Sequence, residues 1–219
     1  SEVNGIEWIR MMYAYPSKFP ADLIDVIKNN EKVCKYIDIP LQHISDNILK
    51  SMRRGITSRQ TKELLSLLKE EIPELVLRTT FIVGYPGETD KEFQELCNFV
   101  EEFKFEKMGT FTYSQEENTE SYSLGDPVPD EVKKSRQSRL MEIQKEISAE
   151  KNRKLIGSEL KILVESLEGD FYVGRSYRDA PEVDGEVLVP SNDDRIIPGN
   201  FYIAKVYDSD EYDLFARLK

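Results

Sequence analysis

The sequence predicts a parallel α/β domain followed by a small antiparallel β-barrel. Over the first 125 residues, short β-rich runs alternate with amphipathic helical stretches, an order typical of parallel strands with right-handed crossovers. A long charged helix is then expected at residues 130–157. After it the hydrophobic period changes to two, and short runs between Gly, Pro and Asp/Asn turns predict an OB-like barrel.

The α/β part begins with two strand–helix pairs. Residues 6–16 predict a strand and residues 19–30 the helix that follows it. Residues 35–43 predict a second strand, and residues 45–55 a helix with Ser45 as its N-cap. The pattern then continues with a longer helix.

That helix is predicted at residues 57–73, where the first turn has the spacing of a capping box. Residues 75–84 predict the third strand, residues 89–103 its helix with a second capping box, and residues 107–114 the fourth strand. Four units are too few to close an eight-stranded barrel. An open sheet, or part of a TIM-like barrel, is therefore expected.

The second part of the chain is predicted to carry a separate barrel. Residues 115–129 are polar and rich in turn formers, which makes them a connection. We expect an α/β domain at 1–129, a connecting helix at 130–157 and a barrel at 158–219. The five predicted barrel strands are 160–166, 170–177, 185–190, 201–208 and 212–218.

Composition indicates a cytosolic protein with a hydrophobic core. Of 219 residues, 39% are hydrophobic and 32% charged, no apolar run is long enough for a membrane helix, and the start does not resemble a signal peptide. Cys34 and Cys97 have no metal or redox spacing, and we expect both to be reduced and buried.

Negative charge is concentrated at the end of the chain. The net charge is −11, and residues 156–219 carry 14 acidic and 7 basic residues. Such a surface repels nucleic acid and attracts basic partners, although the acids could also serve solubility alone.

Polar and turn-forming residues gather where the predicted parallel strands end. Gln42 lies at the end of the second strand, Gly84 lies at the end of the third, and Pro86, Gly87 and Glu88 follow it. Glycines allow a ligand to approach the backbone, and ligands of α/β proteins bind at this edge. The alternative is that the Gly-Tyr-Pro-Gly segment is a turn with no role in ligand binding.

Two other side chains stand out in the α/β part. Arg78 lies within its strand, so an inward charge there needs an anionic partner. His43 is the only histidine, and a structural hydrogen bond is a simpler role for it than catalysis. The sequence contains no Ser/His/Asp order, P-loop or dinucleotide fingerprint.

Three segments together carry a family resemblance: YIDIPLQHISDNILKSMRRG, LRTTFIVGYPGET and FTYSQEENT. Their order and spacing resemble the radical S-adenosylmethionine (SAM) methylthiotransferases over residues 6–125, and the terminal barrel resembles the TRAM domain of that family. The resemblance implies a partial, open radical SAM barrel of parallel strands plus a TRAM barrel.

Two branches of the family compete. One modifies an adenosine in transfer RNA, and the RimO type adds a methylthio group to the β-carbon of an aspartate in ribosomal protein uS12. The segment GRSYRDAPEVDGEV at 174–187 resembles the RimO type. The acidic barrel independently fits a basic protein substrate better than RNA.

The resemblance also implies SAM and two [4Fe-4S] clusters as cofactors of the parent enzyme. A cluster-bound SAM is cleaved to a 5′-deoxyadenosyl radical, which abstracts hydrogen from the substrate carbon. Neither family cysteine set is present in this chain. We therefore predict that this polypeptide alone binds no cluster and is inactive, and that it is a fragment of a longer enzyme.

Family roles transfer to seven residues of this sequence as expectations. Gly84, Pro86, Gly87 and Glu88 resemble the loop near the adenosine of SAM. Gln42 lies where such barrels approach the ribose or methionine moiety, and Arg78 and Thr80 could bind the carboxylate or hydroxyls of SAM.

The partner expected from the resemblance is uS12, and direct binding of nucleic acid or membrane is not expected. Acidic residues of the barrel, Asp179, Glu182 and Asp184, are predicted to recognise basic residues of uS12. A rival interpretation is a non-catalytic acidic module that docks a basic protein.

Overall fold

The computed structural model describes residues 3–219, and the chain forms two compact units. One, the α/β unit, comprises Met11–Gln144. The other, the barrel unit, joins the segment ending at Arg10 to Lys145–Lys219. The division falls within the long helix, and the domain boundaries predicted at 129 and 157 stay a prediction.

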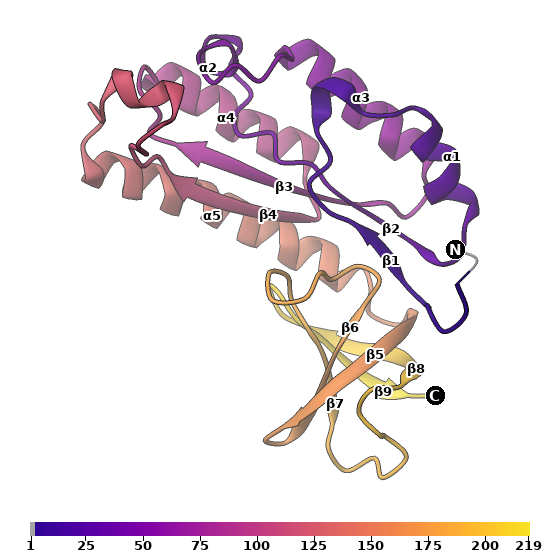
Figure 1. The fold of residues 1–219 in the computed structure, drawn as a ribbon. Helices are drawn as coiled ribbons and strands as arrows, with labels where there is room; N and C mark the ends of the chain where they lie inside the picture. The colour runs from indigo at the N-terminus through magenta and orange to yellow at the C-terminus, as the bar shows by residue number, and fades with distance from the viewer. Residues whose placement is uncertain (1–2) are drawn as a thin grey trace. The chain divides into compact units, whose positions relative to one another are not determined.

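The α/β unit alternates strands and helices as expected (Figure 1). Its elements are the last residue of β1 (Ile9–Met11), η1 (Pro16–Lys18), α1 (Asp22–Asn29), β2 (Val33–Asp38), α2 (Asp46–Ser51), α3 (Ser58–Glu71), β3 (Val76–Val83), α4 (Asp90–Phe103), β4 (Lys107–Thr112), η2 (Glu120–Leu124) and the first part of α5 (Asp130–Arg153). Both predicted capping boxes are present, at the starts of α3 and α4.

The strands form one open sheet in the order β1-β2-β3-β4, which confirms the predicted open α/β architecture. The β2–β3 and β3–β4 pairs are parallel, with Thr80 opposite Gly109. The carboxyl ends of these three strands therefore lie at one edge of the sheet.

Two predicted strands are shorter than expected. The run predicted at 6–16 contains only β1, because Tyr13 adopts φ 61° and interrupts the extended backbone. β2 ends at Asp38, since Pro40 lacks an N–H and Gln42 adopts φ 71°.

The core of the α/β unit lies between the sheet and its helices. Leu77, Thr79, Phe81 and Val83 of β3 are buried; of the alternate residues, Val76 is buried and Arg78, Thr80 and Ile82 are half-buried. Phe81 packs edge-on against Phe99 of α4, with ring centroids 6.3 Å apart. The helices therefore cover one face of β3, and Arg78, Thr80 and Ile82 lie on its other face.

The long helix α5 lies beside β4. Gln137 Nε2 donates to the Thr110 carbonyl at 2.7 Å, and Gln144 Nε2 donates to the Phe105 carbonyl at 3.0 Å. α5 thereby fixes β4 from its edge. None of the helices within residues 3–219 is both long and apolar enough to span a bilayer.

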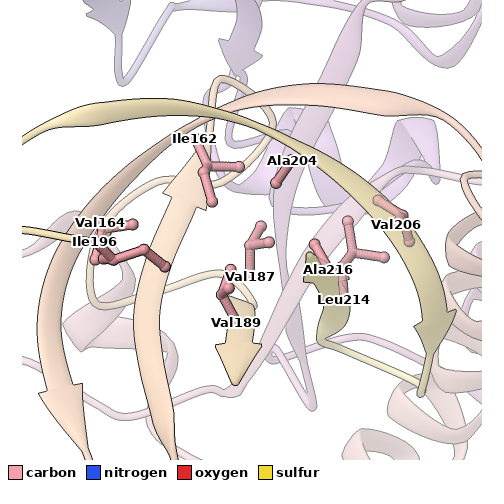
Figure 2. Packing of buried hydrophobic residues seen from close by; sticks show 9 residues of the cluster. All are labelled: Ile162, Val164, Val187, Val189, Ile196, Ala204, Val206, Leu214 and Ala216. Carbon is pink, nitrogen blue, oxygen red and sulfur yellow. The ribbon is translucent and has the colours of Figure 1, made fainter. Parts of the chain in front are cut away.

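The barrel unit contains a closed barrel with strand order β5-β6-β7-β9-β8. Its strands are β5 (Glu159–Glu168), β6 (Phe171–Ser176), β7 (Val187–Pro190), β8 (Phe201–Ser209) and β9 (Leu214–Leu218). All pairs are antiparallel except β7–β9, which is parallel and corrects the expectation of a wholly antiparallel barrel. Small and β-branched side chains fill the interior (Figure 2).

Candidate functional site

A cavity of about 510 Å³ lies at the strand-end edge of the α/β unit. It is bounded by the segment after β2, the ends of β3 and β4, and parts of α2 and η2. Its lining residues are Gln42, Ser51, Met52, Arg54, Ile82, Tyr85, Thr112, Tyr113, Ser114, Glu116, Thr119, Glu120 and Ser121.

Gln42 is held rigidly at the wall of this cavity. Its N–H donates to the Thr80 carbonyl at 2.9 Å, and its carbonyl accepts from the Ile82 N–H at 2.8 Å. The side-chain Oε1 is buried and has no hydrogen-bond partner within the described residues. Because an unsatisfied buried acceptor costs about 1–3 kcal/mol, this oxygen is suited to accept a hydrogen bond from a ligand.

Two tyrosines form an aromatic wall. Tyr85 and Tyr113 follow β3 and β4 and meet edge to face, with ring centroids 5.1 Å apart and an interplanar angle of 76°. The Tyr85 hydroxyl donates to the Ser51 carbonyl at 3.3 Å, and the Tyr113 hydroxyl donates to the Ser121 carbonyl at 3.3 Å. Their rings are therefore fixed before any ligand binds.

The turn after β3 is closed by its own carboxylate. Glu88 accepts hydrogen bonds from the N–H groups of Gly84 and Tyr85, and it lies 3.3 Å from the guanidinium of Arg136 on α5. Burial raises the pKa of Glu88, and the Arg136 charge and the two N–H groups oppose that shift. The carboxylate thus holds the turn together.

Gly84 is required for a steric reason. It adopts φ 73°, and a Cβ at this position would lie 2.4 Å from Cγ of Lys133. The Lys133 ammonium donates to the Tyr113 carbonyl at 3.2 Å, so one side chain of α5 braces the ends of both β3 and β4. Its methylene stem occupies the space beside the glycine.

The predicted SAM residues separate into two groups. Within the predicted loop, Tyr85 lines the cavity. The remaining residues of the loop, Gly84, Pro86, Gly87 and Glu88, form the turn that supports Tyr85. Pro86 is buried and Gly87 is exposed at φ 91°. Gln42 is the predicted residue that reaches the cavity.

Arg78 and Thr80 lie on the half-buried face of β3, outside the cavity wall. The Arg78 guanidinium donates to Asp38 Oδ1 at 3.3 Å, and Asp38 is completely buried. The expected anionic partner of Arg78 is therefore supplied by the neighbouring strand.

The three predicted substrate-binding acids have different surroundings. Asp179 is buried, and its Oδ2 accepts from the Ser176 hydroxyl at 2.7 Å. Asp184 is half-buried and accepts from the Ala180 N–H at 2.8 Å. Glu182 is exposed, with φ 68°. Glu182 is therefore the one of the three that faces solvent fully.

His43 and the cysteines have structural surroundings. His43 is completely buried, and its Nδ1 accepts from the Ser45 N–H at 3.0 Å, which is the expected structural hydrogen bond. Burial lowers the pKa of His43 to about 4. Cys34 and Cys97 are buried free thiols, and burial raises the pKa of Cys97 to about 11. Residues 3–219 hold no group of three or more His, Cys, Asp or Glu side chains placed to bind a metal ion.

Sequence reasoning missed the walls contributed by α2 and η2. Ser51, Met52 and Arg54 line the cavity, but their sequence reads only as the end of a helix. Residues 119–121 lie in a segment predicted as a connection. The sequence feature that could have indicated a ligand-binding role for this connection was its polar composition with a tyrosine.

Comparison with known families identifies both parts of the chain. Residues 2–100 match the Radical SAM superfamily, and residues 156–218 match the TRAM domain. A solved structure of coproporphyrinogen III oxidase (HemN) from Escherichia coli, a radical SAM enzyme, aligns with a TM-score of 0.48 and 11% identity, covering 92% of this chain and 46% of that chain.

Curated relatives are similar over the entire chain. The protein from Cytophaga hutchinsonii named ribosomal protein uS12 methylthiotransferase RimO is 49% identical over 100% of this chain and 50% of its own length. The protein of that name from Caldanaerobacter subterraneus is 51% identical over 98% of this chain and 49% of its length. The chain spans about half the length of these relatives. The chain is therefore similar over its whole length to part of RimO-type proteins, and its two regions match the Radical SAM superfamily and the TRAM domain.

Proposed function

We propose that this chain is part of a methylthiotransferase that adds a methylthio group to the β-carbon of an aspartate in ribosomal protein uS12. The observation that supports this most strongly is 47–51% identity to RimO proteins over 97–100% of the chain. The similarity includes both the α/β unit and the barrel, as expected if they work together. The transfer RNA branch of the family is disfavoured by the same comparison.

The strand-end cavity fits the adenosine or methionine end of SAM. The unpartnered Oε1 of Gln42 would accept a hydrogen bond from a ribose hydroxyl or from the amino group. Tyr85 and Tyr113 provide an apolar aromatic wall beside it. When bound in the complete enzyme, SAM supplies the radical that removes hydrogen from an unactivated carbon.

The other predicted SAM residues retain supporting roles in this proposal. The segment Gly84–Glu88 positions Tyr85, because Glu88 closes the turn and Pro86 is buried beneath it. The exposed backbone at Gly87 remains open to approach by the nucleoside. Arg78 and Thr80 would interact with the carboxylate or hydroxyls from the adjoining face of β3.

The residues of this chain do not fit an iron–sulfur cluster. Cluster iron requires several thiolates at one place, whereas Cys34 lies on β2, Cys97 lies on α4 and both are buried. We therefore assign no cluster ligand here. The ligands of the [4Fe-4S] clusters, of which we propose two, belong to the remaining part of the parent enzyme.

The barrel is proposed to contact uS12. Its 14 acidic and 7 basic residues over 156–219 favour a basic protein in the cytoplasm over nucleic acid. Within the loop after β6, Glu182 would meet the substrate directly. Asp179 and Asp184 would instead maintain the loop conformation through their internal hydrogen bonds.

The SAM assignment is tested in the full-length parent protein with its clusters reconstituted. Gln42→Ala should weaken SAM binding about three- to tenfold, as expected for the loss of one hydrogen bond. Gln94→Ala is the matched control, because Gln94 pairs with Asn98 on the exposed surface of α4. Equal SAM affinity in the Gln42→Ala variant and the parent would remove Gln42 from the site.

A further inference from the structure

Residues 3–10, which include the first two residues of β1, are part of the barrel unit, although they are distant from the barrel in sequence. Trp8 packs edge-on against Phe201 of β8, with ring centroids 4.8 Å apart. The guanidinium carbon of Arg175 on β6 lies 5.9 Å from the centroid of the same indole. Phe201 and Arg175 both pair with Leu163 of β5, so Trp8 spans three neighbouring strands on the outside of the barrel.

A second contact fixes the same segment along β5. Glu7 forms an ion pair with Lys161 at 2.8 Å, and the Lys161 ammonium lies 4.7 Å from the centroid of the Phe201 ring. An exposed ion pair of this kind contributes at most about 1 kcal/mol. It adds a second contact with β5 beside the packing of Trp8.

Arg10 ends the segment at the loop that follows β6. Its guanidinium donates to the Tyr177 carbonyl at 2.7 Å and to the Ser176 carbonyl at 3.3 Å. Hydrogen bonds from a charged donor are stronger than those between neutral groups, and both of these are partly buried. Arg10 therefore fixes the last backbone carbonyl of β6 and the first backbone carbonyl of the loop.

The loop has its own network downstream of these carbonyls. Asp179 Oδ2 accepts from both the backbone N–H and the hydroxyl of Ser176, and Asp184 Oδ2 accepts from the Ala180 N–H. The network places Glu182 at the exposed tip. Since Ser176 belongs to the network and to the Arg10 contact, the loop conformation depends on both.

We infer that residues 3–10 act as a strap that holds the loop at 177–186 in one conformation, with Arg10 as its positioning residue. The strap and the loop both belong to the barrel unit, although more than 160 residues separate them in the chain. The assignment of that loop to uS12 recognition rests on the proposed function. The strap itself rests only on the contacts of Trp8, Glu7 and Arg10.

Amide hydrogen exchange of the 219-residue chain tests the strap. Arg10→Met removes the guanidinium and keeps an apolar stem, and it should speed exchange of the Asp179 and Ala180 amides about tenfold. Trp8→Ala should raise exchange of the same amides by a smaller factor, because it loosens the strap without removing a loop contact. Arg217→Met is the control, since Arg217 stacks on Tyr207 and should leave the loop unchanged.

Two results would overturn the strap. One is unchanged exchange of the loop amides in Arg10→Met. The other is an equal increase over the amides of β5 and β8, which would show that Arg10 stabilises the entire barrel. Binding of purified uS12 to the same variants separates the two proposals. Faster loop exchange with weaker binding supports both, and faster loop exchange with unchanged binding supports the strap but contradicts recognition of uS12 by this loop.

Discussion

The contact between Gly84 and Lys133 makes a quantitative prediction about the strand-end turn. An L residue in the left-handed region costs about 1–2 kcal/mol, and overpacking a tight site costs about 1–3 kcal/mol. Gly84→Ala incurs both costs, because Gly84 has φ 73° and its new Cβ would lie 2.4 Å from Lys133 Cγ. We expect a loss of about 2–5 kcal/mol in the free energy of unfolding.

Gly87 provides a matched control in the same turn. Its φ is 91°, but a Cβ added there would meet no atom within 4 Å, so Gly87→Ala should cost only about 1–2 kcal/mol. Lys133→Ala removes the obstructing Cγ, and the cost of Gly84→Ala in that background should fall by about 1–3 kcal/mol. Each free energy is obtained from urea unfolding followed by circular dichroism.

The double-mutant comparison can refute this reasoning. Equal costs for Gly84→Ala and Gly87→Ala, together with no coupling to Lys133→Ala, would show that the side chain of α5 does not restrict the turn. The glycine would then be required for its backbone conformation alone.

Three further predictions concern buried or exposed groups. Burial lowers the pKa of His43 to about 4, against 6.5 for an ordinary histidine, so the free energy of unfolding should be at its full value above pH 6.5 and fall by about 3 kcal/mol as the pH falls toward 4. His43→Asn keeps an acceptor for the Ser45 N–H and should remove this pH dependence, which urea unfolding at pH 7 and pH 5 measures. Cys97, whose pKa is raised to about 11, should react with iodoacetamide at pH 8 only on unfolding, and rapid labelling of the native chain would contradict its burial. Glu182→Lys should weaken uS12 binding at low salt without changing the free energy of unfolding. Asp179→Asn should lower the free energy of unfolding by about 1–3 kcal/mol. A destabilised Glu182→Lys variant with normal uS12 binding, or an Asp179→Asn variant of unchanged stability, would contradict these roles.

Local sequence patterns predicted the helices and strands well where the apolar positions of the pattern are the positions that the fold buries. The capping boxes at Thr57 and Thr89 begin α3 and α4 as expected, and alternating apolar residues gave the barrel strands. The strand predicted at 6–16 was too long, because the structure has a strand only at Ile9–Met11. Hydrophobic composition there reflects Trp8 packing on the barrel, and a left-handed Tyr13 cannot be read from composition.

The candidate site was only partly predictable because it depends on contacts distant in sequence. Gln42 was identified from its place at the end of a predicted strand, and the structure shows it at the cavity. Glu88 was expected near a ligand, yet its carboxylate binds its own turn and pairs with Arg136, which lies 48 residues away. Sequence spacing identifies the strand-end edge, but it does not show which side chains turn inward.

The most direct test of the proposed activity is mass spectrometry of uS12 after reaction with the complete cluster-loaded parent enzyme, SAM, a reductant and a sulfur source. We predict that one aspartate of uS12 gains the mass of a methylthio group, and that Gln42→Ala lowers the yield. Unmodified uS12 alongside a transfer RNA that gains the same group would contradict the proposed activity.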